Sequence, residues 1–231
     1  MVDVVVDAAT VVCLRESEAR WDVLLGQNEV KNWLRSTRER DVLMRYPGEW
    51  KFPGGTRDAA DASLSATATR ELDEEFLGAV SPSSSVVLHF ASAKTTIAVQ
   101  GKRFKMHNFV ALAPENPWLE DATLVDRINA RLQAKRRAFQ AAVDDGTFWT
   151  MDEQAKEALS PEVHQVQWFP IADAIAMMEP GRVAHVNAFQ AEQFARYGVV
   201  ERDPMYQSMR TLQDMASLRR YDIQDLPRTK I

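Results

Sequence analysis

Three glutamates near the first third of the chain have the side-chain type and spacing that a metal-dependent reaction needs. Glu71, Glu74 and Glu75 are three and four residues apart, which places their carboxylates on one face of a helix. Like charges this close repel each other, so the pattern predicts a cation among them. The candidates are Arg70 and a hard ion such as Mg²⁺ or Mn²⁺, which prefers oxygen ligands. A solvated acidic face is the competing interpretation.

The residues around the glutamates predict a glycine turn followed by an amphipathic helix. Three apolar residues at helical spacing would bury the opposite face of this helix: Leu64, Ala68 and Leu72. Either Asp61 or Ser63 is suited to cap the amino-terminal end. The tripeptide Pro-Gly-Gly that ends at Gly55 has a backbone that can approach a ligand closely. Together these features favour a functional site over a merely solvated helix.

The same segment resembles the signature of the Nudix hydrolases. That signature runs from a glycine through a spaced acid to Arg-Glu-apolar-any-Glu-Glu and a closing glycine. The matching positions are Gly55, Arg70, Glu71, Leu72, Glu74, Glu75 and Gly78. The interval from Gly55 to Arg70 is one residue longer than the commonest form, so Asp61 or Ala62 stands where the family usually has a glutamate. One extra residue also precedes Gly78.

The longer interval is similar to that of the Nudix subgroup that cleaves coenzyme A and its thioesters. The match runs from Gly48 to Glu75 and includes an acid at Asp58. The upstream Arg and His pattern of the subgroup is not reproduced, because the segment that begins at Arg45 is one residue short and lacks the His. This departure concerns the substrate more than the chemistry.

The resemblance implies a Nudix α/β/α sandwich, an α/β fold with a mixed sheet between helices. It implies that Glu71, Glu74 and Glu75 hold Mg²⁺ or Mn²⁺, with the carbonyl of Gly55 as a further ligand. Arg70 would orient the carboxylates through charge-assisted hydrogen bonds. Glu71, Glu74 and Arg70 are therefore the expected catalytic residues. The implied reaction is hydrolysis of a phosphoanhydride in a nucleoside diphosphate derivative, with metal ions that activate the attacking water.

Basic residues near the glycine turn are candidates for contact with an anionic substrate. Lys51 precedes the turn, Arg57 follows it, and Arg45 lies upstream. Solvated surface charge is the alternative interpretation of this upstream segment.

Residues 115–163 lack the alternating or continuous apolar pattern of the predicted strands, which indicates a helical insertion. Leu124, Ile128 and Leu132 form an apolar stripe at a spacing of four residues. Basic residues cover much of the remaining surface: Arg127, Arg131, Lys135, Arg136 and Arg137. They form either a solvated face or a lid that binds phosphate or ribonucleotide. Acidic residues of the insertion are candidates for a general base: Glu115, Glu120, Asp121, Asp144, Asp145, Asp152 and Glu153.

Length and composition favour one domain. The 231 residues are 45% hydrophobic and carry a formal net charge of −5, which suits one substantial core and disfavours a surface that binds nucleic acid throughout. We expect a single domain over residues 1–231, with the helical insertion at about 115–163 and a helical carboxy-terminal extension at about 185–220. The single cysteine, Cys13, excludes an intrachain disulfide.

The apolar amino-terminal segment is predicted to be a buried strand and not a signal peptide. Asp3 and Asp7 interrupt it, and no basic residue precedes it. No membrane span is expected elsewhere, since no apolar run reaches about 18 residues. A cytoplasmic protein is the default expectation, with import into an organelle left open. The sequence does not indicate an oligomeric state.

Apolar runs and turn signals predict the remaining elements. Strands are expected at residues 4–14, 21–26, 48–52, 86–91, 95–100, 102–113 and 163–171. Helices outside the insertion are expected at residues 172–178, 187–197 and 204–218.

Several substrates and two function classes stay open at this stage. Coenzyme A or an acyl derivative is the leading substrate, with dinucleoside polyphosphates, nucleotide sugars and the 5′ end of RNA as alternatives. A Nudix-fold module that binds a nucleotide or RNA without cleaving it is the second class. The replacement of the usual glutamate by Asp61 or Ala62 supports the second class, whereas the complete set of Arg70 and three glutamates argues against it.

Overall fold

One mixed sheet forms the centre of the computed structural model, which describes residues 4–17, 20–44, 46–78, 86–95, 102–178, 187–197 and 228–229. Its eight strands are β1 (Val4–Ser17), β2 (Arg20–Asn28), β3 (Trp50–Lys51), β4 (Gly54–Thr56), β5 (Leu88–Thr95), β6 (Lys102–Leu112), β7 (Val163–Pro170) and β8 (Arg228–Thr229). The valine-rich β1 is the longest of them, as its content of β-branched residues favours.

Strand β1 organises the sheet because it contacts three other strands. It pairs in parallel with β6 along most of its length, from Val4 opposite Lys102 to Leu14 opposite Leu112. On its other side, residues 8–10 pair with β4 and residues 13–17 pair with β2, both antiparallel. Strand β2 also pairs with β7 and β3, and β5 joins β6 to β8. The expected α/β architecture with a mixed sheet is confirmed.

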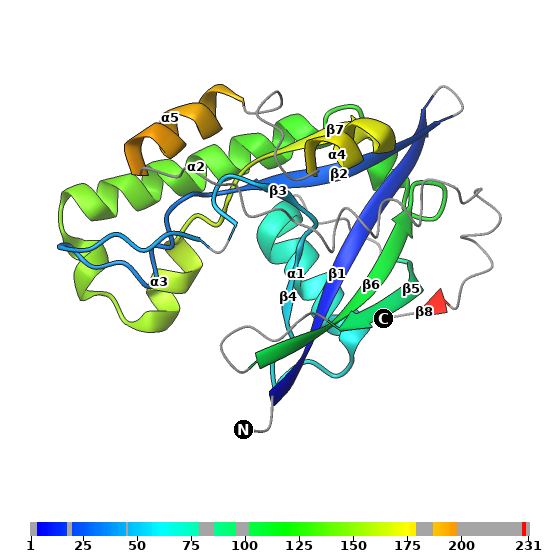
Figure 1. Ribbon diagram of the computed structural model, residues 1–231, viewed down its shortest axis with the longest axis horizontal. Helices are drawn as coiled ribbons and strands as arrows, with labels where there is room; N and C mark the ends of the chain where they lie inside the picture. Colours follow the sequence, from blue (N-terminus) through cyan, green and yellow to red (C-terminus); the bar gives the residue numbers. More distant parts are fainter. Residues whose placement is uncertain are drawn as a thin grey trace.

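Helices cover both faces of the sheet (Figure 1). On one face lie α1 (Leu64–Leu72), its π-helical continuation η1 (Asp73–Leu77) and the long α2 (Leu124–Asp144). On the other face lies α4 (Ile171–Met178). Side chains alternate along β1, so Val11 and Cys13 pack towards α1 and α2, whereas Val12 and Leu14 pack towards α4. Burial raises the pKa of the Cys13 thiol to about 12, as expected for a core cysteine.

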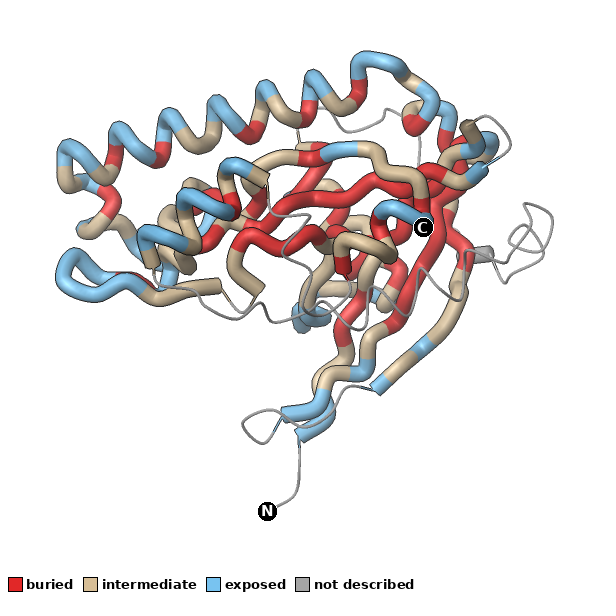
Figure 2. The backbone as a smooth tube through the Cα atoms, turned by 45° about the horizontal axis from the view of Figure 1, so that its top comes forward, coloured by how far each residue is buried: buried red, intermediate tan, exposed pale blue. Residues whose placement is uncertain are grey.

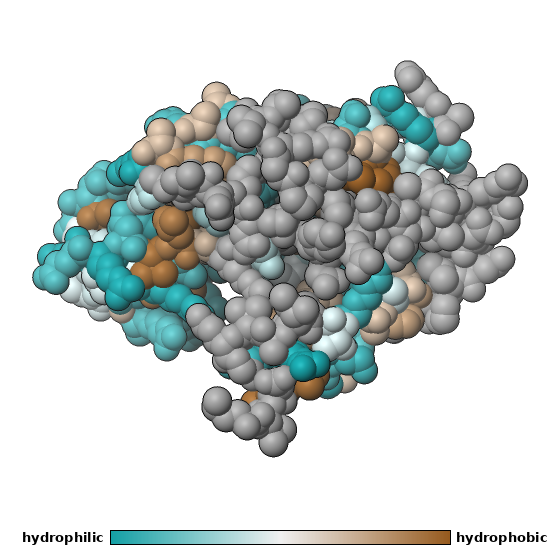
Figure 3. Space-filling view, viewed as in Figure 1, coloured by the Kyte–Doolittle hydropathy of each residue, from teal (hydrophilic) through white to brown (hydrophobic). Residues whose placement is uncertain are grey.

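The helical insertion is confirmed and is built around α2. It consists of η3 (Pro117–Glu120), α2, η4 (Thr147–Thr150) and α3 (Glu153–Leu159). Leu124, Ile128 and Leu132 are buried against the sheet layer, and Figure 2 shows buried and exposed positions alternating around this helix. The far end of α2 packs into a separate aromatic cluster with Phe148 and Trp33. Figure 3 shows a mainly hydrophilic surface, with scattered apolar patches, at this end of the molecule.

Most predicted elements are present, with two differences. Strand β5 continues to Thr95, where the sequence predicted a break after residue 91, and residues 96–101 lie outside the described part of the chain. Residues 54–56, expected as a turn, form the short strand β4 because they pair with β1. The helix α5 (Ala188–Tyr197) agrees with the prediction, and the helix expected at 204–218 lies outside the described residues. In the described part, every helix is too short or too polar to cross a membrane.

Candidate active site

The glycine turn is held against both β1 and the glutamate-bearing helix. A Cβ atom at Gly54 would lie 2.4 Å from the carbonyl oxygen of Ala9, and a Cβ atom at Gly55 would lie 2.4 Å from Oε1 of Glu71. Both contacts are shorter than any normal carbon–oxygen approach, so neither position accepts a side chain without movement. The two glycines therefore let the backbone of β4 lie close to β1 on one side and close to the carboxylate of Glu71 on the other.

The helix that carries the glutamates begins at Ser63, whose side chain accepts a hydrogen bond from the Ala66 amide at 3.1 Å. Asp61, the other predicted cap, does not cap the helix and binds the residues around it instead. It accepts hydrogen bonds from the Thr67 hydroxyl and the Asp58 amide, both at 2.9 Å, and it binds Arg70. Of the two residues that could replace the usual glutamate of the Nudix signature, Asp61 is thus the one that contacts the signature arginine.

The helix widens from α to π geometry between its first and second glutamates. Glu71 belongs to α1, whereas Glu74 and Glu75 belong to the π turn η1. A π turn accommodates an added residue within a helix and occurs often at functional sites. It lies where the sequence has one residue more than the signature before Gly78, and Phe76 in this turn is fully buried. The extra residue is absorbed by a change of helix type and used for core packing.

The three glutamates consequently occupy different environments. Their side chains are 14% exposed for Glu71, 56% for Glu74 and 5% for Glu75. Burial, together with the nearby Glu75, raises the pKa of Glu71 to about 7, although Arg70 opposes the shift. The sequence predicted all three carboxylates on one face of the helix; in the structure the Glu74 side chain is exposed, whereas the Glu75 side chain, in the π turn, is buried.

Arg70 connects most of the acidic groups at the site. Its Nε and Nη2 atoms bind the two carboxylate oxygens of Asp61, each at 3.1 Å, and its Nη1 atom lies 2.9 Å from both Glu71 Oε1 and Glu74 Oε2. Nη2 also donates to the carbonyl of Thr56 at 3.2 Å. The hydrogen bonds from Arg70 hold the pKa of Asp61 at about 2, well below its usual value. Asp61 is therefore ionised at neutral pH and keeps the guanidinium in place.

Lys51 neutralises the most buried of the glutamates. Its ammonium group contacts Glu75 Oε1, while the amide of Gly54 donates to Oε2 at 2.9 Å. Burial disfavours the charge on Lys51, but the nearby carboxylates, Glu75 foremost, together outweigh burial and raise the pKa of the lysine. The predicted basic residue before the glycine turn thus lies within the site, bound to a glutamate.

Of the other two predicted substrate-binding residues, the structure describes only Arg57. Arg57 is exposed, and its guanidinium donates to the carbonyl of Asp61 at 3.1 Å. Arg45 lies outside the described residues.

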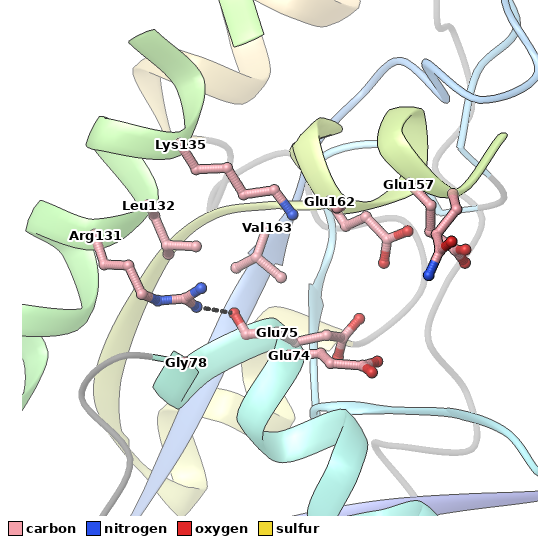
Figure 4. Close-up of a pocket in the computed structure, with 11 residues that line it drawn as sticks. Glu74, Glu75, Gly78, Arg131, Leu132, Lys135, Glu157, Glu162 and Val163 are labelled. Atoms are coloured by element: carbon pink, nitrogen blue, oxygen red, sulfur yellow. Dashed lines mark hydrogen bonds between the residues drawn. The ribbon is translucent and has the colours of Figure 1, made fainter. Parts of the chain in front are cut away.

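A cavity of about 420 Å³ opens beside the π turn (Figure 4). The π turn and Gly78 form one wall, α2 forms a second, and α3 with the start of β7 forms the rest. The lining residues are Glu74, Glu75, Gly78, Arg131, Leu132, Lys135, Gln154, Glu157, Ala158, Glu162 and Val163. The predicted insertion therefore provides much of the enclosure around the glutamates.

Only two of the five basic residues predicted on the insertion line this cavity, namely Arg131 and Lys135. Arg131 donates to the carbonyl oxygens of Glu75 and Phe76 at 3.0 and 2.9 Å and so binds the end of the π turn. Gly78 makes this approach possible, since a Cβ atom there would lie 2.7 Å from the Arg131 guanidinium. The remaining three point elsewhere: Arg127 pairs with Asp121, Arg136 contacts Glu29 and the carbonyl of His164, and Arg137 is exposed.

The acids predicted as general bases are not among the residues that line the cavity. Two other acids of the insertion, Glu157 and Glu162, line it instead. Glu162 is half-buried and immediately precedes β7, and Figure 4 shows its carboxylate on the side of the cavity next to Lys135. The sequence contained one usable signal for Glu162, its position directly before a predicted strand, where a residue is held by the sheet edge.

The oxygen donors at the site suit a hard divalent cation, but they are not arranged as a ready-made cage. Within the described residues, no group of three His, Cys, Asp or Glu side chains converges in that way. The cations among the glutamates are the side chains of Arg70 and Lys51. The donor chemistry and the side-chain-free approach at Gly55 fit a metal ion, which would replace these ion pairs in part.

Comparison with known proteins places these features in a family. The NUDIX domain model matches residues 6–190. A NUDIX hydrolase from Alicyclobacillus acidocaldarius superposes with a TM-score of 0.53 and 14% identity over 98% of each chain. The NUDIX domain of Shewanella oneidensis NrtR, solved with ADP ribose, covers 84% of this chain and 87% of its own at 18% identity and a TM-score of 0.41. No curated protein matches the sequence. At these identities, the likeness to solved structures concerns the fold.

Proposed function

Because this chain belongs to the Nudix family and is a pyrophosphohydrolase of that family, we propose that it cleaves the diphosphate bond of coenzyme A or an acyl-CoA. The observation that carries the site assignment is that Arg70 contacts Glu71 and Glu74, Lys51 contacts Glu75, and Glu74 and Glu75 line one cavity. The longer interval between Gly55 and Arg70 supports the choice of substrate.

Divalent metal ions are the general cofactors of this family. We propose that Glu71, Glu74, Glu75 and the carbonyl of Gly55 hold Mg²⁺ or Mn²⁺ in this chain. When bound, such ions neutralise the diphosphate and lower the pKa of the attacking water. The carboxylates are the ligands that these ions prefer, and burial together with the nearby Glu75 raises the pKa of Glu71, so a cation beside Glu71 would stabilise its charged form.

The protein side chains have separate roles in this proposal. Asp61 holds Arg70, and Arg70 holds Glu71 and Glu74 in position. Glu162 faces the same cavity and is the proposed general base, since it lies outside the group that Arg70 and Lys51 engage.

The cavity is large enough for a diphosphate with an adjoining group, because ligand pockets have volumes of about 300 to 1,000 Å³. Two structural observations weigh against the alternatives considered from the sequence. Arg127 and Arg136 are engaged with protein groups, which reduces the basic surface available to RNA. Asp61 binds the signature arginine in place of the usual glutamate, which removes the reason to infer a non-catalytic binding module.

The test is a substrate panel with purified protein. Coenzyme A, acetyl-CoA, ADP-ribose, diadenosine tetraphosphate and 5′-triphosphorylated RNA are incubated with Mg²⁺, Mn²⁺ or EDTA, and the products are separated and identified by mass. We expect coenzyme A to yield 4′-phosphopantetheine and adenosine 3′,5′-bisphosphate only with a metal ion present. Turnover of another compound alone would correct the substrate. No turnover of any compound would overturn the catalytic assignment.

A further inference from the structure

The lysine of α2 that lines the cavity, Lys135, differs from the other charged groups around it. Arg131 lies one helical turn earlier on the same face, but its guanidinium is engaged by the carbonyls of Glu75 and Phe76. Among the residues that the structure describes, Lys135 forms neither a hydrogen bond nor an ion pair, although its side chain is half-buried. A half-buried ammonium group without a direct partner has lost hydrogen bonds to water and has gained no protein hydrogen bond in their place.

The position of Lys135 directs this ammonium towards the place where a phosphate would lie. Figure 4 shows its side chain extending from α2 into the cavity, across from the π turn that carries Glu74 and Glu75. Glu162 is near enough to favour the charged form of the lysine, although burial lowers its pKa overall. If metal ions occupy the glutamates, Lys135 and Arg131 are the basic side chains of the cavity that lie next to them.

We propose that Lys135 binds a non-bridging phosphate oxygen of the substrate diphosphate from the wall opposite the π turn, so that the helical insertion forms part of the substrate site. This inference rests on the proposed function, because it assumes a diphosphate in the cavity. A lysine suits the task because its flexible stem carries a compact charge with three hydrogen-bond donors. The binding of a charged oxygen would give the Lys135 ammonium group the partner that it lacks among the described residues.

The same helix supplies a matched control for this proposal. Arg137 lies two residues further along α2, is exposed and does not line the cavity. The variant Lys135→Met removes the charge and keeps a long side chain, Lys135→Arg keeps the charge, and Arg137→Met removes one charge from α2 outside the cavity. A general electrostatic effect of α2 would change both methionine variants equally, whereas a phosphate contact would change only Lys135→Met.

The experiment measures binding of inorganic diphosphate in the presence of Mg²⁺ by calorimetry, together with kcat and KM for whichever substrate the panel identifies. We expect Lys135→Met to weaken diphosphate binding about tenfold or more and to raise KM with little change in kcat, as loss of a charged hydrogen bond to bound substrate does. Lys135→Arg should retain most of the affinity, and Arg137→Met should bind like the wild type. Thermal melting confirms that each variant is folded.

Several results would overturn the proposal independently of the catalytic assignment. Equal diphosphate binding by the wild type and Lys135→Met would do so, even with an active enzyme, and so would absence of diphosphate binding by the wild type. If Lys135 only balances Glu162, adding Glu162→Gln to Lys135→Met will restore binding, which would also refute a phosphate contact. Conversely, weaker binding by Lys135→Met in a protein that cleaves no compound would uphold this inference while the proposed function fails. If Lys135→Met does not fold, Lys135→Gln takes its place.

Discussion

Arg70 and Asp61 form a two-bond ion pair that joins the loop after the glycine turn to the glutamate-bearing helix. Both nitrogen–oxygen distances are 3.1 Å, and the Asp61 side chain is only 7% exposed. The geometry is the parallel two-bond arrangement that arginine makes with a carboxylate, which adds orientation as well as attraction. Since the same guanidinium contacts Glu71 and Glu74, the pair controls where those carboxylates lie.

Replacing Asp61 with Asn should therefore reduce stability in a manner that depends on pH. Loss of the charged hydrogen bonds is expected to lower the free energy of unfolding by about 1 to 3 kcal/mol at pH 7. The folded-state pKa of Asp61 is depressed to about 2, so its contribution is present above the unfolded pKa of about 3.9 and is lost as the pH falls towards 2. Urea denaturation of both proteins at pH 7, 4 and 3 checks this, because the difference should shrink over that range. A constant difference would show that Asp61 acts by packing alone.

Replacing Glu71 with Gln should abolish most activity while stabilising the metal-free protein at alkaline pH. A lost ligand is expected to reduce kcat/KM by at least about 100-fold, since even indirect partners of metal ligands contribute 10- to 100-fold. The pKa of Glu71 is raised to about 7, so the wild type loses stability as the pH rises from about 4.5 through 7, and the variant does not. Melting in EDTA at pH 5 and pH 8, with activity measured alongside, tests both parts. A variant less stable than the wild type at pH 8 would contradict the second.

Replacing Lys51 with Met should expose the role of the Lys51–Glu75 pair. The variant leaves the buried carboxylate of Glu75 without its cation, and removal of one partner of a buried pair typically destabilises a protein by about 3 to 5 kcal/mol. If Glu75 is a metal ligand, Mn²⁺ should raise the melting temperature of this variant more than that of the wild type. The exposed Lys105→Met is the control for loss of a single positive charge. Equal responses to Mn²⁺ would argue against metal binding at Glu75.

The neighbouring glycines of the turn should respond differently to the same substitution. Gly55→Ala places a Cβ atom against the flexible carboxylate of Glu71, so the side chain moves and activity should fall about tenfold or more through misplacement, with little loss of stability. Gly54→Ala places a Cβ atom against the backbone of Ala9, which cannot yield without disturbing the β1–β4 pairing, and should cost about 1 to 3 kcal/mol of stability. Melting curves and kinetics of the two variants separate these outcomes. The prediction is wrong if both variants lose the same property.

The sequence by itself was sufficient for the features that depend on local spacing. The glutamate-bearing helix, the apolar stripe of the insertion and most strands follow from residue periodicity, which depends on near neighbours. The same holds for the resemblance to the Nudix signature, because its residues lie within one short segment and the family is confirmed.

Tertiary structure decided which of the candidate side chains meet. Of Asp61 and Ala62, only Asp61 binds Arg70, and of the basic residues predicted on the insertion, only Arg131 and Lys135 reach the cavity. Glu162 joins the glutamates from about 90 residues away because β7 ends the insertion beside the π turn. Such contacts depend on chain crossings and on the change from α to π geometry, which shift side chains by less than a helical turn. The spacing of residues along the chain does not predict these shifts of the side chains, because packing between elements that are distant in sequence determines them.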